Sequence, residues 1–180
     1  MFEPVTIGNI FDEEDLIFLR MVIDGKTAAY KSFYDENCKR EVLQSKALDE
    51  YFGKKLEPLA RKLFRDETLR STFVVYAKYD HPESFLPVHK DRHACVYNMS
   101  YCLTQEKPWY FNIDGRPYYM EENELIAYSG TDSEHGRDDM GSSGNSEVEM
   151  VFFHFAPSDY WYFEHCEDFR LDYEHVSQSN

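Results

Sequence analysis

The sequence predicts an α+β fold in which helices come first and short strands follow. In the first part of the chain, apolar residues recur at spacings of three and four, whereas after Ser71 the chain consists of β-branched and aromatic runs separated by turn residues. With 180 residues, the chain has the length of one domain. We therefore expect a single domain over 1–180, with a helical part over 1–70, a β core of roughly eight strands over 71–157 and a C-terminal extension over 158–180.

Two stretches of the first part have helical spacing. From Asp12 to Ile23, acidic residues precede apolar ones, Asp12 is placed to cap the first turn, and Asp24-Gly25 ends the helix. From Cys38 to Leu69, the spacing of the apolar residues predicts two further helices that are broken near Gly53. We expect the helices to pack on the outer face of one sheet.

The second part contains strand patterns and a hairpin. The strand patterns are "STFVVYAKY", "CVYNMSYCL", "ELIAYSG" and "VEMVFFHF". The segment "PWYFNIDGRPYYM" predicts two aromatic strands around Asp114-Gly115, because this dipeptide favours the backbone of two-residue hairpin loops. The residues "SGTDSEHGRDDMGSSGNSE", before the last pattern, are expected to form a long loop.

The charge of the chain limits its partners. It has 34 acidic against 19 basic residues, a formal net charge of −15 that repels phosphate backbones and anionic lipid head groups. We therefore expect no bulk nucleic-acid binding and no membrane partner. The cysteines form no CxxC pair, and no run of about 18 apolar residues occurs. These features predict reduced thiols and a cytoplasmic protein, and they leave the oligomeric state open.

A histidine and an aspartate stand two residues apart at the start of a predicted strand, in "LPVHKDRH". Because side chains at i and i+2 of a strand point to the same face, His89 and Asp91 can reach one point. A third ligand has to come from a neighbouring strand, and His135 follows about 45 residues downstream. Two imidazoles and one carboxylate leave adjacent coordination positions open, which suits non-heme Fe(II). We therefore predict a metal site of His89, Asp91 and His135.

Other histidines offer alternatives to this ligand set. His93 is in phase with His89 and Asp91, so a site formed by these three residues is geometrically conceivable. His154 stands in the apolar pattern "VEMVFFHF", where we expect a core or pocket-lining histidine rather than a ligand.

In these residues the chain resembles the Fe(II)/2-oxoglutarate-dependent dioxygenases, in particular their prolyl-hydroxylase-like branch. The resemblance covers 72–157 and consists of a strand with a tyrosine ten residues before His89, followed by "YNMSYCL", "ENELIAYSG", "EHGRD" and "EVEMVFFHF". It implies a double-stranded β-helix core, which is a jelly-roll or cupin-like fold, with the N-terminal helices packed on one sheet. It also implies Fe(II), 2-oxoglutarate and O2 as cofactors, with His89, Asp91 and His135 as the catalytic metal ligands.

The resemblance further implies a hydroxylation reaction. A dioxygenase of this kind would hydroxylate a C–H bond of an amino acid, a peptide or another small polar substrate, with release of succinate and CO2. Halogenation is disfavoured, because halogenases of this superfamily have a small residue where this chain has Asp91. The sequence does not identify the substrate.

The closing strand departs from the family pattern. In the family, a basic residue at the start of this strand usually pairs with the distal carboxylate of 2-oxoglutarate, but the corresponding "SGNSEVEMV" has no lysine or arginine and carries Glu147 and Glu149. A dianion cannot lie beside buried carboxylates without a cation that offsets them. The candidates are Lys107, near the position used in related branches, Arg137, just after the distal histidine, and Arg92, the least favoured.

Tyrosines complete the predicted co-substrate site. Tyr79 matches the family's tyrosine that hydrogen-bonds 2-oxoglutarate, and Tyr97 or Tyr101 would add a second hydroxyl group.

The sequence also leaves two other functions open. One is a cupin-like metalloenzyme that does not use 2-oxoglutarate and in which the substrate itself chelates iron, which would explain the missing basic residue. The other is a non-catalytic binding domain on the same fold, which predicts no tight, stoichiometric metal binding.

Overall fold

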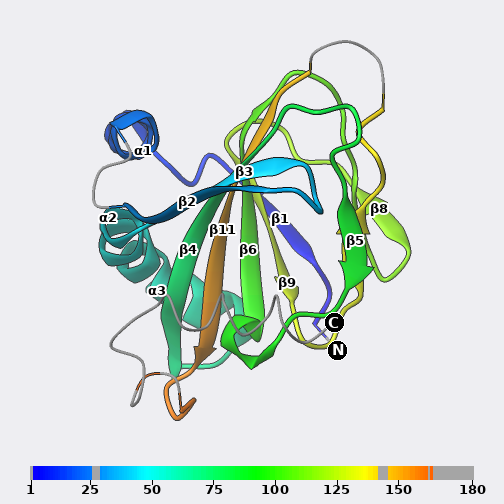
Figure 1. Cartoon of the computed structure of the whole chain (residues 1–180). Helices are drawn as coiled ribbons and strands as arrows, with labels where there is room; N and C mark the ends of the chain where they lie inside the picture. The colour runs from blue at the N-terminus through cyan, green and yellow to red at the C-terminus, as the bar shows by residue number, and fades with distance from the viewer. Residues whose placement is uncertain (1, 26–28, 142–145, 162, 164–180) are drawn as a thin grey trace.

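The computed structural model describes residues 2–25, 29–141, 146–161 and 163, and its strands form two antiparallel sheets (Figure 1). The larger sheet has the strand order β1-β9-β6-β11-β4-β3-β2, and the smaller sheet has the order β5-β10-β7-β8. The C-terminal extension expected over 158–180 lies for the most part outside the described residues.

The bounds of the elements are as follows. The larger sheet contains β1 Val5–Gly8, β2 Ala29–Asp35, β3 Arg40–Ser45, β4 Leu69–Tyr79, β6 Tyr97–Gln105, β9 Glu124–Ser129 and β11 Val148–Pro157. The smaller sheet contains β5 Leu86–His89, β7 Phe111–Ile113, β8 Arg116–Tyr118 and β10 His135–Arg137. The helices are α1 Glu13–Gly25, α2 Lys46–Leu48 and α3 Lys54–Phe64, with a π-helical turn over Asp49–Gly53 and a 3-10 turn over His93–Cys95.

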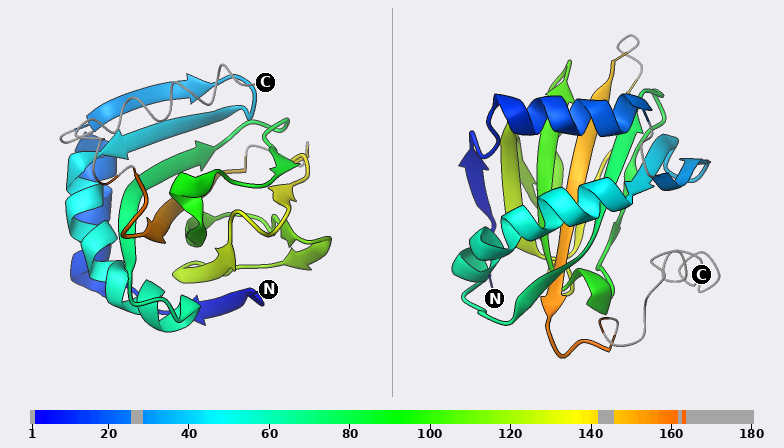
Figure 2. Two further views of the ribbon diagram at one scale, coloured as in Figure 1. Left: turned by 90° about the horizontal axis from the view of Figure 1, so that it is seen from below. Right: turned by 90° about the vertical axis from the view of Figure 1, so that its left-hand side faces the viewer.

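The two faces of the larger sheet are covered by different elements, one by helices and the other by the smaller sheet. The helices α1 and α3 run across one face (Figure 2), and the hydrophobic cluster there joins helix and sheet residues, among them Leu19, Val22, Phe52, Ala60, Tyr101 and Phe153. The opposite face meets the smaller sheet in a second cluster, which includes Ala77, Tyr79, Cys102, Phe111, Ile113 and Met150. Because side chains alternate along a strand, neighbouring residues of β6 or β11 lie in different layers.

The first helix begins as the sequence predicts. The backbone N–H of Asp15 donates to Oδ1 of Asp12 at 2.9 Å, and the N–H of Asp12 donates to Oδ2 of Asp15 at 3.2 Å. This reciprocal pair satisfies two backbone donors at the start of α1. The helix over Asp12–Ile23 is thereby confirmed, with α1 extending to Gly25.

The helices predicted between Cys38 and Leu69 are partly wrong. The first residues form strand β3 instead, and four consecutive side chains of β3, Val42 to Ser45, are buried. The buried residues are Val42, Leu43, Gln44 and Ser45, so the segment lacks the apolar-polar alternation of a strand with one exposed face and could be read as part of the helix that follows.

The predicted break near Gly53 is also wrong. The chain is helical from Lys46 to Phe64, and Gly53 has the ordinary helical values φ −55° and ψ −52°. A Cβ at this position would lie 2.5 Å from Oγ of Ser71. The glycine therefore permits close packing of the helix on β4 rather than ending the helix.

The second half of the chain contains the predicted hairpin and one strand that was expected to be loop. Asp114 and Gly115 join β7 to β8 with φ values of 49° and 73°, the backbone that a two-residue hairpin turn requires. The expected long loop contains the short strand β10, which pairs with both β5 and β7. Among the described residues, no helix is long and apolar enough to span a membrane.

Candidate metal centre

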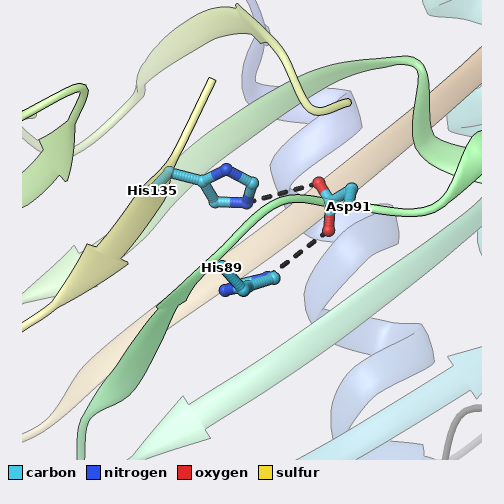
Figure 3. A group of neighbouring side chains, drawn as sticks. All are labelled: His89, Asp91 and His135. Carbon is cyan, nitrogen blue, oxygen red and sulfur yellow. Dashed lines mark ion pairs between the residues drawn. The ribbon is translucent and has the colours of Figure 1, made fainter. Parts of the chain in front are cut away.

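Three ligating side chains meet at one end of the smaller sheet. His89 is the last residue of β5, His135 is the first residue of β10, and the two are cross-strand partners. Asp91 follows β5, and its backbone N–H donates to the carbonyl of Gly130 at 2.8 Å. Figure 3 shows the two imidazoles directed toward the carboxylate.

The distances are compatible with a single metal ion. Nε2 of His89 is 3.4 Å from Oδ1 of Asp91, and Nε2 of His135 is 3.3 Å from Oδ2. One ligand atom from each residue lies within 4.8 Å of the others. The structure thus brings together the three residues that the sequence suggested, which we call the triad, whereas His93 is exposed and lies outside this group.

Backbone carbonyls fix the orientation of both imidazoles. Nδ1 of His89 is 2.7 Å from the carbonyl oxygen of Pro87, and Nδ1 of His135 is 3.0 Å from that of Ser133. A proton held on Nδ1 by a carbonyl leaves the lone pair on Nε2, which is the arrangement of metal-binding histidines.

The electrostatics of the triad favour an ionised carboxylate. Burial opposes the charge on Asp91, but hydrogen bonds with His135 and His89 outweigh it and hold the pKa of Asp91 well below its usual range. Burial lowers the pKa of His89, but its bonds to Asp91 and to the carbonyl of Pro87 outweigh burial and raise that pKa. The centre therefore offers one anionic oxygen between two nitrogen donors.

Asn98 and Gly130 lie against the carboxylate of Asp91. The side-chain amide of Asn98, on β6, donates to Oδ2 of Asp91. A Cβ at Gly130 would lie 2.6 Å from both Nδ2 of Asn98 and Oδ2 of Asp91, so this contact requires glycine. Asn98 was not predicted from the sequence, although its place one residue after Tyr97 puts it on the opposite face of β6.

Arg137 is a buried cation close to the triad. Its guanidinium donates to the carbonyl of Trp109 and lies 4.8 Å from the Trp109 ring centroid and 5.2 Å from that of Phe111. In the described part of the chain, no carboxylate pairs with this residue, which is 3% exposed. Burial lowers the pKa of Arg137. Because an unpaired buried charge is costly, the arrangement favours an anionic ligand.

Tyr79 belongs to the same group of side chains. It is fully buried, and its ring lies edge-on to that of Trp109, with centroids 4.9 Å apart. Its hydroxyl accepts a hydrogen bond of 2.8 Å from Arg40 on β3, which also pairs with Asp35 at 3.0 Å. Arg40 was not predicted as a site residue, because its segment was expected to be helical and instead forms β3.

The other predicted co-substrate residues lie elsewhere. Tyr97 stacks on Phe64 of α3 at 4.3 Å, on the helix-covered face of the larger sheet, and Tyr101 lies on the same face. Nζ of Lys107 donates to the carbonyl of Gly141 at 3.2 Å. The structure therefore does not bring the two tyrosines to the triad.

The two glutamates of the closing strand do not face the triad. Glu149 points to the helix layer, where it pairs with Arg20 of α1 at 2.7 Å and accepts a hydrogen bond from Tyr76. Glu147 pairs with Lys78 at 2.8 Å. Between the sheets the position next to Glu149 is held by Met150, whose sulfur lies 3.8 Å from Arg137. Arg137 thus supplies a cation beside the strand that lacks one.

Comparisons with known proteins place the fold. The chain matches no protein-family model, and no curated protein matches its sequence. A solved oxidoreductase of the 2OG-Fe(II) oxygenase family from Burkholderia pseudomallei matches with a TM-score of 0.65 and 10% identity, over 85% of each chain. A Pseudomonas putida prolyl-4-hydroxylase matches with a TM-score of 0.61 and 13% identity, over 86% of this chain and 92% of the other.

A third similar structure contains ligands. It is HygX from Streptomyces hygroscopicus with nickel, 2-oxoglutarate and hygromycin B bound, with a TM-score of 0.60 and 9% identity over 87% of this chain and 83% of the other. Identities this low establish a common fold. The expected likeness to the 2-oxoglutarate oxygenase superfamily and its prolyl-hydroxylase-like branch is confirmed at that level.

Proposed function

We propose that the protein is a non-heme Fe(II)- and 2-oxoglutarate-dependent oxygenase that hydroxylates a C–H bond of an amino acid, a peptide or another small polar substrate, releasing succinate and CO2. One observation carries the proposal: the triad and the unpaired guanidinium of Arg137 lie on the same side of β10. The ring of Phe111 contacts both, with its centroid 5.8 Å from that of His135 and 5.2 Å from the guanidinium. The shared fold supports this reading.

The donor set fits a divalent metal of the iron type. Two imidazole nitrogens and one carboxylate oxygen would hold the ion and would leave room for further ligands. When bound, Fe(II) and 2-oxoglutarate supply the activation of dioxygen for attack on a C–H bond. His135 is the more rigid ligand, because its ring is 2% exposed and packs 4.8 Å from that of Tyr128.

Arg137 and Tyr79 would bind the co-substrate. A dicarboxylate bound to the metal through its keto acid end has a second carboxylate to place, and the guanidinium offers it charge-assisted hydrogen bonds. The Tyr79 hydroxyl accepts from Arg40 and so keeps its own proton to donate. Trp109 and Phe111 cover the guanidinium and exclude water, which strengthens these bonds.

The substrate class stays broad in this proposal. One similar structure is a prolyl-4-hydroxylase, and another holds hygromycin B. Substrates of different chemistry are therefore compatible with the fold.

The test is anaerobic reconstitution with Fe(II), followed by titration with 2-oxoglutarate and then admission of air. We expect a saturable visible charge-transfer band, its loss in His89→Ala, and succinate after air is admitted. Stoichiometric iron without a band would favour a cupin-like metalloenzyme in which the substrate itself chelates the metal. Absence of tight metal binding would favour a non-catalytic binding domain.

A further inference from the structure

Next to the triad, Asn98 leaves a buried acceptor without a partner. The residue is 2% exposed, and its Oδ1 is one of two buried side-chain polar atoms in the described part of the chain that lack a hydrogen bond. An unsatisfied buried carbonyl costs free energy comparable to a lost hydrogen bond. Because buried polar groups are normally satisfied, this atom indicates a place for a donor that the chain does not supply.

The orientation of the Asn98 amide is fixed. Nδ2 donates to Oδ2 of Asp91 and lies 3.4 Å from the hydroxyl of Tyr128, so it points toward β9. A flipped amide would set its oxygen against the carboxylate of Asp91, since neither group could then donate. Oδ1 therefore points away from β9, toward the other neighbour of β6, which is β11.

His154 is the residue of β11 that is paired with Asn98. Its Nδ1 is 3.1 Å from the carbonyl oxygen of Phe73 on β4, and its ring packs on the Phe73 ring at 4.3 Å. Burial lowers the pKa of His154 to about 4, against the opposing effect of Asp91. With the proton on Nδ1, Nε2 keeps its lone pair as an acceptor, and the side chain is half-buried.

The unsatisfied Oδ1 of Asn98 and the half-buried imidazole of His154 thus occupy adjacent register positions beside the metal ligands. We propose that Oδ1 of Asn98 and Nε2 of His154 form a substrate subsite for a neutral group that carries two N–H or O–H donors, such as a primary carboxamide or a pair of hydroxyls. A carboxylate or phosphate at this place would meet acceptors alone.

This inference rests on the proposed function, because it assigns the subsite to the substrate of the oxygenase. It adds the substrate class: the group next to the reacting C–H bond is an amide or a hydroxyl compound rather than an acid. The subsite can be tested without knowledge of the full substrate. Acetamide and acetate have nearly the same shape, but only acetamide carries N–H donors.

The experiment is a titration of the ¹⁵N-labelled protein, metal-free and loaded with Zn(II), with acetamide and separately with acetate. We expect acetamide to shift the signals of His154 Nε2 and of the Asn98 side-chain amide, and acetate to leave both in place. His81, which lies in a loop, serves as the internal reference. Equal shifts by the two probes, or no shift with acetamide, would overturn the proposal.

A matched pair of variants gives a second measure. His154→Phe keeps a ring against Phe73 and removes Nε2, so we expect acetamide to bind about five- to tenfold more weakly, as for the loss of one hydrogen bond. His93→Phe makes the same change at an exposed position and is expected to leave binding unchanged. Equal acetamide affinity in the wild type and His154→Phe would contradict the subsite.

The same samples separate the two proposals. Zn(II) affinity of the wild-type protein measures the triad, and acetamide binding to the metal-free protein measures the subsite. If the wild-type protein binds acetamide but not Zn(II), the proposed function is contradicted. If it binds Zn(II) but not acetamide, only the substrate subsite is contradicted.

Discussion

His89 and His135 are cross-strand partners at one end of the smaller sheet, with their ring centroids 4.4 Å apart. This register brings both Nε2 atoms to the carboxylate of Asp91. A slip of β5 by one residue would turn His89 to the opposite face. The centre therefore depends on the pairing of β5 with β10 as well as on the His-x-Asp spacing.

Replacing the carboxylate ligand should remove the metal. We expect Asp91→Ala to lose stoichiometric iron and all oxygenase activity while the fold stays nearly intact, because the site is at the edge of the core. Metal analysis and circular dichroism measure the two properties. Asp139→Ala, at an exposed position after β10, is the control and should keep its iron. Unchanged iron occupancy in Asp91→Ala would show that the triad is wrongly assigned.

The two cation candidates should behave differently. Arg137→Met should weaken 2-oxoglutarate binding to the Ni(II)-loaded protein about 30-fold or more, because a buried charged partner typically contributes at least about 2 kcal/mol. Without ligand, the free energy of unfolding of this variant should be equal or higher, since an unpaired buried charge is removed. Calorimetry and urea unfolding measure the two effects.

Lys107→Ala is the comparison for that experiment. Its ammonium group bonds a carbonyl in the loop at Gly141, so we expect a change in 2-oxoglutarate affinity below about threefold. A large effect in Lys107→Ala together with none in Arg137→Met would reverse the assignment. If neither variant weakens binding, both candidates are wrong.

Asn98 should increase the affinity for the metal, because it orients the ligand Asp91. Asn98→Leu has a similar shape but cannot donate to Oδ2, and residues that orient a metal ligand typically contribute about 10- to 100-fold in affinity. Titration with Ni(II) gives the dissociation constant. Ser100→Ala, two residues along the same face of β6, should retain the wild-type value. Equal affinity in both variants would mean that Asp91 needs no support from Asn98.

Asp49 should make the stability depend on pH. Burial raises the pKa of Asp49 to about 7, with an opposing hydrogen bond from the N–H of Val74. Since the folded protein keeps this proton between about pH 4, the unfolded value, and pH 7, the free energy of unfolding should fall as pH rises through that window. Asp49→Asn keeps an acceptor for Val74. Urea unfolding should therefore find it more stable than the wild type at pH 8 and equal at pH 4; equal stability at both would contradict the assignment.

Local patterns were sufficient for several parts of the structure. The turn at Asp114-Gly115 and the cap of α1 at Asp12 each depend on a few neighbouring residues, and the structure contains both. By contrast, β3 was mistaken for a helix, because its sequence REVLQS does not alternate between apolar and polar residues and runs directly into a true helix.

The sequence by itself determined that His89 and Asp91 share a face, because a strand repeats every two residues whatever packs against it. It also named His135 and Arg137. Only the tertiary structure decided that Arg137 is a buried cation with no carboxylate partner among the described residues, since its surroundings, Trp109 and Phe111, come from a region more than twenty residues away. The tertiary structure also decided which of Tyr97 and Asn98 faces the metal ligands. Side chains alternate along β6, so the two residues must point to opposite faces of the sheet. Which face is covered by helices and which meets the smaller sheet depends on the packing, and this packing directs Asn98 to Asp91 and Tyr97 to the helices.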